Sequence, residues 1–430
     1  MSGRRSEAAG GWRYNRWLQL AAGIGCMAMI ANLQYGWTLF VHPIDAKYKW
    51  GEAAIQVAFS CFVLTETWLV PIEGWFVDRF GPRVVVALGG VLVALSWVVN
   101  AVADSLPALY AGAVIGGIGA GCVYGTCVGN ALKWFGRQRG LAAGCTAAGF
   151  GAGAALTVIP IAQTIAAQGY ETAFLYFGLG QGLVVLLLAL VLRAPVAASD
   201  TGRRAAAQQN GRDWKPREVL RSDVFWVLYA MFVMVAAGGL VAAAQIAPMA
   251  RGLGIASLPV SLAGLTLPAL TFAISLDRIL DGIGRPGFGW ISDRIGRENT
   301  MAIAFAIQAL SLVGLALAGH NPVAFVLLTA VFFGAFGEIY SLFPATCGDA
   351  FGTRYATTNA GMLYTAKGTA SLLVPFASLL AAGAGWQSVF VITILLDVAA
   401  AAIALLVLKR VRRTMVAGSR LAPHGIERTA

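Results

Sequence analysis

The sequence contains few charged residues. Only 12% of its 430 residues are Asp, Glu, Lys or Arg, and 58% are hydrophobic. A soluble globular protein usually has about 25% charged residues. This composition excludes an ordinary soluble domain and predicts a protein that crosses a membrane several times.

Residues that build metal and catalytic sites are also scarce. The three histidines and six cysteines form no CxxC motif and no His-spaced cluster. We therefore interpret the cysteines as small packing residues. The sequence also lacks a Ser/His/Asp set and a P-loop for ATP hydrolysis. We expect no enzymatic activity, no cofactor and no bound metal. The energy for any process that this protein drives must therefore come from solute or ion gradients across the membrane.

Apolar segments long enough to span a membrane recur along the chain. About 20 apolar residues are needed to cross roughly 30 Å of hydrocarbon. Twelve such segments lie near residues 17–41, 54–77, 84–103, 107–131, 140–166, 172–192, 224–248, 258–291, 301–319, 322–348, 357–383 and 386–408. The first is not followed by a small-residue cleavage site, so we expect a spanning helix and not a removable signal. The predicted fold class is an all-α membrane protein with twelve transmembrane helices in two six-helix bundles.

The polar segments divide the chain into five parts. We predict a cytoplasmic N-terminal tail over 1–16, an N-terminal six-helix bundle over 17–193, a cytoplasmic linker over 194–222, a C-terminal six-helix bundle over 223–409 and a cytoplasmic C-terminal tail over 410–430. The linker has little apolar content and nothing in it suggests a separate domain.

The positions of Lys and Arg predict the orientation of the chain. Of the 31 basic residues, 25 fall in the two tails and in the loops on one side of the membrane. Only Lys47, Lys49 and Arg251 fall on the other side. Because basic loops stay in the cytoplasm, both termini are predicted to be cytoplasmic. The net charge of +11 thus indicates topology, and we expect no binding to nucleic acid.

A short motif occurs twice, and its two Asp residues are half the chain length apart. The first copy contains Gly74, Asp78, Arg79, Gly81 and Arg83, and the second contains Gly289, Asp293, Arg294, Gly296 and Arg297. Both copies, which we place after the second and eighth helices, resemble the cytoplasmic loop signature of the major facilitator superfamily. The resemblance implies a twelve-helix transporter fold and a gating role for the motif, but it does not indicate a substrate.

Four charged residues lie within the eighth apolar segment: Asp277, Arg278, Asp281 and Arg285. At 100° per residue they fall within about 100° of one another around a helix. Charged groups in hydrocarbon need a partner, a substrate or water. We therefore predict one polar stripe on an otherwise apolar helix.

Three further ionisable residues lie inside other segments: Glu66 in the second, Glu338 in the tenth and Lys367 in the eleventh. One interpretation is structural, with Asp281 pairing with Arg285 or Arg278, and Glu338 pairing with Lys367. The other is that Arg285 and Lys367 form an anion clamp. With four acids against three cations, the set is not a preformed trap for a dianion.

Several short motifs are similar to those of the bacterial oxalate/formate antiporters. They include Gln34-Tyr35-x-Trp-Thr-Leu, Arg139-Gly-Leu-Ala-x-Gly, Thr146-Ala-Ala-Gly-Phe-Gly, Tyr340-x-Leu-Phe-Pro and Ala366-Lys367-x-Thr-Ala-Ser. The resemblance implies that Arg285 and Lys367 hold the two ends of a carboxylate substrate. It implies a surrounding wall of Gln34, Tyr35, Tyr124, Phe336, Tyr340 and Tyr364.

The chain also departs from this family. Phe336 and Tyr364 stand where the best-known member has Trp. That member has uncharged polar residues at the positions of Asp277, Arg278 and Asp281, and it lacks Glu66 and Glu338. Asp281 and Arg285 instead resemble the eighth-helix Asp/Arg pair of the proton-coupled monocarboxylate transporters, in which protonation of the Asp would free the Arg for an anion.

Three functions remain open from the sequence. The first is a secondary active transporter of small carboxylates that exchanges oxalate for formate by alternating access. The second is a proton-coupled monocarboxylate symporter in which Asp281 or Glu338 titrates. The third is a substrate sensor with the same fold that does not transport. In each case the resemblance to bacterial antiporters implies a monomer in the lipid bilayer of a bacterial inner membrane. Its partners are expected to be small carboxylates and, in the symporter, protons.

Overall fold

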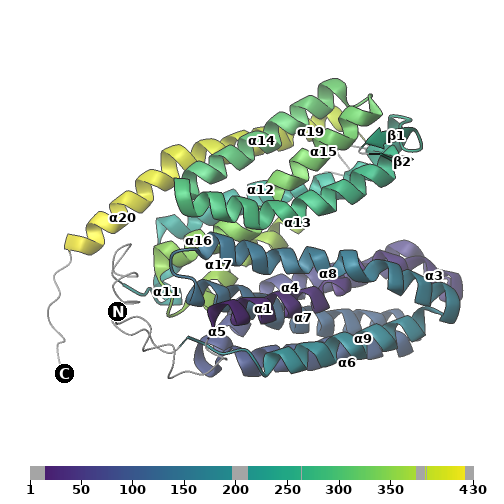
Figure 1. The fold of residues 1–430 in the computed structure, drawn as a ribbon, viewed down its shortest axis with the longest axis horizontal. Coiled ribbons are helices and arrows are strands. Elements are labelled where there is room, and N and C mark those ends of the chain that lie inside the picture. The colour runs from purple at the N-terminus through teal and green to yellow at the C-terminus, as the bar shows by residue number, and fades with distance from the viewer. Residues whose placement is uncertain (1–14, 196–211, 263, 374–382, 384, 422–430) are drawn as a thin grey trace.

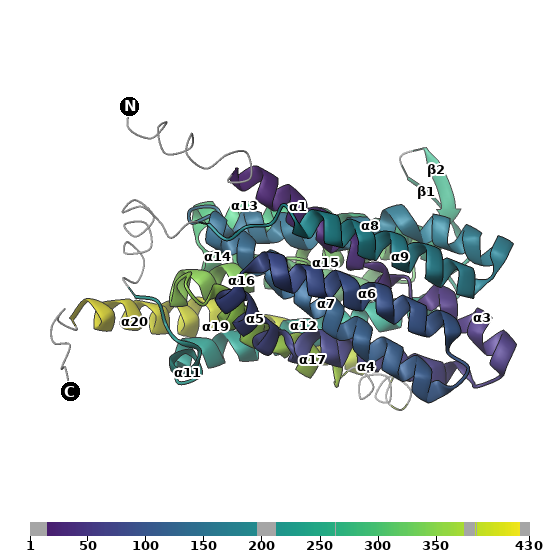
Figure 2. The same ribbon diagram turned by 90° about the horizontal axis from the view of Figure 1, so that it is seen from below.

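The computed structural model describes residues 15–195, 212–262, 264–373, 383 and 385–421, and it consists of two helical bundles (Figures 1 and 2). The first bundle contains α1 (Arg16–Ile30), α2 (Asn32–Tyr35), α3 (Thr38–Tyr48), α4 (Glu52–Trp68), α5 (Val70–Phe80), α6 (Pro82–Val102), α7 (Leu106–Trp134), α8 (Arg139–Gln168) and α9 (Tyr170–Ala189). The predicted all-α membrane fold is confirmed.

The second bundle follows a short helix, α11 (Pro216–Val219). It contains α12 (Asp223–Gly252), α13 (Ala269–Ile295), α14 (Arg297–Ala318), α15 (Pro322–Phe336), α16 (Ile339–Phe351), α17 (Ala356–Ser371), α19 (Trp386–Ile403), the π-helix η2 (Ala404–Leu408) and α20 (Lys409–Leu421). In Figure 1 the helices α12, α13, α14, α15 and α19 of this bundle lie above the first bundle, with α13 beside α8, while α16 and α17 lie at the level where the two bundles meet. Most of the predicted tails and linker (1–14, 196–211 and 422–430) and the end of the eleventh segment (374–382) lie outside the described residues.

Within the described ranges, nine helices are long and apolar enough to cross a membrane. The second predicted span makes ten, since α4 and α5 form one span bent by 43° around Leu69. The other two predicted spans contain α13, which carries too many charges to qualify by apolarity, and α17, whose continuation is only partly described. The predicted C-terminal tail begins as a helix, because α20 continues directly from η2.

The eighth span begins later than predicted. The sequence indicated a helix from residue 258, but the structure has an antiparallel hairpin of β1 (Pro259–Leu262) and β2 (Leu265–Pro268) there. Pro259 pairs with Pro268 across the hairpin, and Gly264 has a φ of +80°. Proline cannot continue a helix from these positions, and glycine adopts positive φ without a steric penalty. Apolarity alone therefore mispredicted this segment.

The bundles meet through α8, which packs against α13 and α16, and through α17, which packs against α4, α5 and α7. Where α8 crosses α13, a side chain on either Gly140 or Gly289 would overlap the backbone oxygen of the other. Such small residues let two helix backbones approach closely. This crossing holds the two bundles together at the end of the molecule where α8 begins.

Candidate functional site

The charged stripe on α13 is buried except at one position. Asp277, Asp281 and Arg285 have only 3%, 4% and 2% of their surface exposed. Arg278, which lies about 100° around the helix from Asp277, is exposed, and its guanidinium lies 5.3 Å from the centre of the Tyr35 ring in the other bundle. The prediction of one shared face therefore holds for three of the four residues.

Arg285 is held by groups from both bundles. Its Nη2 donates to Asp281 Oδ2 at 2.5 Å, and its Nη1 donates to the Ala147 carbonyl of α8 at 2.8 Å. The guanidinium carbon lies 4.6 Å from the centre of the Tyr340 ring. The predicted pairing of Asp281 with Arg285 is present, whereas Asp277 makes no ion pair among the described residues.

Lys367 pairs with an acid that we had not assigned to it. The sequence suggested Glu338, but Lys367 Nζ lies 3.1 Å from Glu66 Oε2 in α4 of the first bundle. The ammonium also donates to Tyr364 Oη at 2.9 Å and to Gln34 Oε1 at 3.4 Å. Glu338 lies at the break between α15 and α16, and neither of its oxygens has a hydrogen-bond partner among the described residues. The predicted pairing of Glu338 with Lys367 was wrong because α17 faces α4 across the bundle interface.

Aromatic rings surround the two cations. The predicted wall residues contact one another in pairs. Tyr124 stacks on Tyr364 with 4.5 Å between the ring centres, and Phe336 lies edge-on to Tyr340 with 6.2 Å between the ring centres. The ring of Tyr35 is linked to the others through Phe150. The centre of the Phe150 ring lies 5.2 Å from that of Tyr35 and 5.9 Å from that of Tyr124. Phe150 belongs to the Thr146-Ala-Ala-Gly-Phe-Gly motif, but it was not predicted to be part of the wall.

The space beside this wall is small. A cavity of about 20 Å³ is lined by Tyr124, Tyr340, Tyr364 and apolar residues. That volume holds about one water molecule. The cations themselves are enclosed by the protein's own groups, since Arg285 is 2% and Lys367 is 3% exposed.

Two buried acids were missed by the sequence analysis. Glu73 in α5 is 6% exposed and Asp397 in α19 is fully buried. Both lie inside segments that we had identified as apolar, so a scan of those segments for acidic residues finds them. The count of four intramembrane acids was therefore too low.

Each copy of the repeated motif links the two bundles. Asp78 of α5 accepts from the backbone N–H and the hydroxyl of Thr358, at 3.0 and 2.6 Å, in the first turn of α17. Asp293 of α13 accepts from the backbone N–H groups of Gly140 and Leu141, at 3.1 and 2.9 Å, in the first turn of α8. A carboxylate at a helix N-terminus satisfies free N–H groups and the helix dipole. Each Asp thus caps a helix of the opposite bundle.

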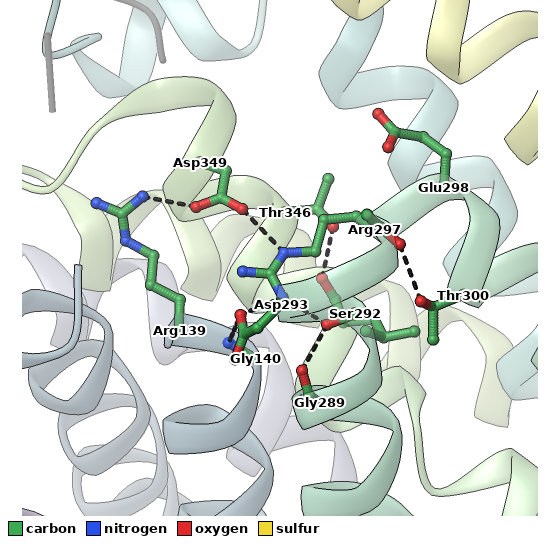
Figure 3. Close-up of polar contacts among 12 residues, drawn as sticks. Arg139, Gly140, Gly289, Ser292, Asp293, Arg297, Glu298, Thr300, Thr346 and Asp349 are labelled. Carbon is green, nitrogen blue, oxygen red and sulfur yellow. Dashed lines mark hydrogen bonds and ion pairs between the residues drawn. The ribbon is translucent and has the colours of Figure 1, made fainter. Parts of the chain in front are cut away.

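Figure 3 shows a network of ion pairs at the same end of the molecule. Asp349 of α16 accepts from Arg139 Nη1 of α8 at 2.6 Å and from Arg297 Nε of α14 at 2.9 Å. Arg297 also pairs with Asp293 at 2.7 Å. Because α8 belongs to the other bundle, Asp349 joins the bundles directly.

The remaining motif residues lie around the helix ends. Gly81 and Gly296 follow α5 and α13 with φ of +84° and +95°. The Arg79 guanidinium lies 5.3 Å from the Trp75 ring, and that of Arg294 lies 3.7 Å from the Trp290 ring. Arg83 lies partly buried in the first turn of α6. Each motif copy was predicted to follow a helix. Most of each copy instead forms the last turns of that helix, because α5 continues up to Gly81 and α13 up to Gly296.

Comparison with known proteins agrees with this architecture. The family model of the Major Facilitator Superfamily matches residues 22–375 and 279–425. An oxalate:formate antiporter of Oxalobacter formigenes is 36% identical over 415 residues, which cover 95% of this chain and 96% of that protein. Monocarboxylate transporter 12-B of Danio rerio is 23% identical over 77% of this chain and 72% of its own length.

Solved structures show the same fold. The proton:xylose symporter XylE superposes with a TM-score of 0.69 at 14% identity, covering 91% of this chain and 95% of that chain. The human organic anion transporter MFSD10 superposes with a TM-score of 0.64 at 16% identity, covering 91% and 99%. The chain belongs to the major facilitator superfamily of membrane transporters and, within it, to the oxalate/formate antiporter family.

Proposed function

We propose that this transporter carries small carboxylates, exchanging a dicarboxylate such as oxalate for a monocarboxylate such as formate. The supporting observation is that two buried cations from two helices lie beside one ring. The Arg285 guanidinium is 4.6 Å and the Lys367 ammonium 6.0 Å from the centre of the Tyr340 ring. Arg binds a carboxylate through two parallel hydrogen bonds, and Lys acts as a point charge.

The aromatic wall supports the same class of substrate. Tyr124, Tyr340 and Tyr364 combine apolar rings with hydroxyl groups that can donate to a carboxylate. Gln34 adds an amide donor beside Lys367. A small anion would gain hydrogen bonds in this site while the rings exclude water.

Alternating access would follow from the position of the ion pairs. The Asp78, Asp293 and Asp349 contacts close the end of the molecule that carries the repeated motif. We place this end in the cytoplasm of a bacterial cell, with the protein acting as a monomer in the inner membrane. Opening this end would break these contacts as the two bundles rock around the central site.

Exchange can be tested by counterflow in proteoliposomes. Labelled oxalate outside should enter vesicles loaded with formate faster than it enters empty vesicles, and a protonophore should not change the rate. An uptake that requires a proton gradient and ignores internal formate would contradict exchange. That outcome would favour symport.

Proton-coupled symport of a monocarboxylate is the second candidate, and the Asp281–Arg285 ion pair favours it. In this mechanism, protonation of Asp281 releases Arg285 for the substrate. The Asp281→Asn substitution mimics the protonated acid and should flatten the dependence of transport on pH. The measurement is initial uptake at several pH values in wild type and variant. An unchanged profile would indicate that the pair is purely structural.

A further inference from the structure

The acid Glu66 holds the ammonium of Lys367 across the bundle interface. Glu66 is fully buried near the end of α4, and its Oε2 lies 3.1 Å from Lys367 Nζ. Tyr364 Oη also donates to Glu66 Oε1 at 3.4 Å. One carboxylate of the first bundle thus binds two groups of α17 in the second.

Lys367 has no donor left for another anion. An ammonium has three N–H donors, and here they face Glu66, Tyr364 and Gln34. A carboxylate that binds to Lys367 must therefore displace one of these three groups. Glu66 is the only one of the three that carries a charge, so it is the group that a substrate carboxylate can replace without leaving the ammonium uncompensated.

Arg285 is neutralised in the same way on its own helix. Asp281 takes one side of the guanidinium and the Ala147 carbonyl takes the other. With all four groups ionised, Arg285, Lys367, Asp281 and Glu66 carry no net charge together. An unpaired buried charge would strongly oppose closure of the bundles around it. The substrate-free centre can close because each cation already has a carboxylate.

We propose that Glu66 substitutes for the substrate carboxylate in the empty carrier and gives this protein a second activity, net transport without a counter-substrate. A strict exchanger must not change its orientation when empty, and two unpaired cations at its centre would prevent that. The Glu66–Lys367 pair removes one of these charges and lets the empty carrier reorient. The proposal rests on the carboxylate transport proposed above and extends it beyond exchange.

The test compares two transport modes in the same proteoliposomes. Labelled carboxylate is loaded inside, and its exit is measured with unlabelled carboxylate outside for exchange and without it for net efflux. Valinomycin and equal potassium hold the membrane potential at zero, and strong buffer on both sides prevents a pH gradient. Wild type should show both modes.

Glu66→Gln should reduce net efflux by at least about tenfold, because the empty carrier must then bury Lys367 without a counter-ion. Exchange should stay within about twofold of wild type, because the bound substrate itself pairs with Lys367. Glu66→Asp keeps the charge and should retain more net efflux than Glu66→Gln. Glu73→Gln is the matched control, since Glu73 is a buried acid of the same span that forms no ion pair among the described residues, and both modes should be unchanged.

Parallel loss of both modes in Glu66→Gln, or no change in either, would overturn the role of Glu66. Exchange without net efflux in wild type would also overturn it, while leaving carboxylate transport intact. Absence of both modes in wild type for every carboxylate in a panel would instead contradict the proposed function itself.

Discussion

Lys367→Gln and Arg285→Gln should each reduce carboxylate uptake by at least about a hundredfold. Removing one partner of a buried charge pair costs about 2–5 kcal/mol or more, and the substrate would lose its main attraction. Each substitution also leaves a buried acid without its counter-ion, Glu66 in one case and Asp281 in the other. Those acids would then repel the incoming carboxylate.

The measurement is initial uptake in proteoliposomes with equal amounts of inserted protein, checked by the elution profile of the purified variants. Arg251→Gln is the control, because Arg251 is an exposed basic residue at the end of α12. It should transport at the wild-type rate. A normal rate in either Lys367→Gln or Arg285→Gln would remove that residue from the binding site.

Asp349→Asn should open the end of the molecule that carries the repeated motif, here called the motif end. Asp349 lies between Arg139 of one bundle and Arg297 of the other, and all three are buried. Loss of its charge leaves Arg139 without its ion pair, whereas Arg297 keeps Asp293. Breaking a buried ion pair costs about 3–5 kcal/mol. The ratio of closed to open molecules should therefore fall by about a hundredfold or more.

Distances between spin labels can measure this shift. Arg137 in the first bundle and Arg354 in the second are exposed and lie in loops at the motif end. With cysteines placed there in a background lacking the natural ones, the distance distribution should move to longer values in Asp349→Asn. Asp223→Asn, a change at an exposed acid, should leave the distribution unchanged. An unaltered distribution in Asp349→Asn would show that its ion pairs do not hold this end closed.

The sequence predicted the fold class because apolar segments of spanning length have few alternatives in a membrane. The error at residues 258–268 has a local cause. Pro259, Gly264 and Pro268 are turn and strand-edge signals, and the apolar residues between them concealed the hairpin. Attention to these breakers would have placed the start of α13 correctly.

The identity of the buried charged residues was easier to predict than the ion pairs that they form. Charge in an apolar segment identified Arg285, Lys367 and Glu66 individually. Helical spacing within α13 also suggested the Asp281 partner of Arg285. No local pattern could show that α17 packs against α4, so the Glu66–Lys367 pair required the arrangement of the bundles. Helix capping is a natural role for the motif Asp residues, but the identity of the capped helices, each in the opposite bundle, was hidden for the same reason.

Competition between acids and their uncharged amides would test most directly whether the two cations bind a carboxylate. Uptake of one labelled carboxylate is measured in proteoliposomes while oxalate, formate, lactate and the matching amides are added in turn. Our account predicts that small carboxylates inhibit uptake and that amides of the same size do not. Equal inhibition by amides and acids, or no uptake of any small carboxylate, would contradict it.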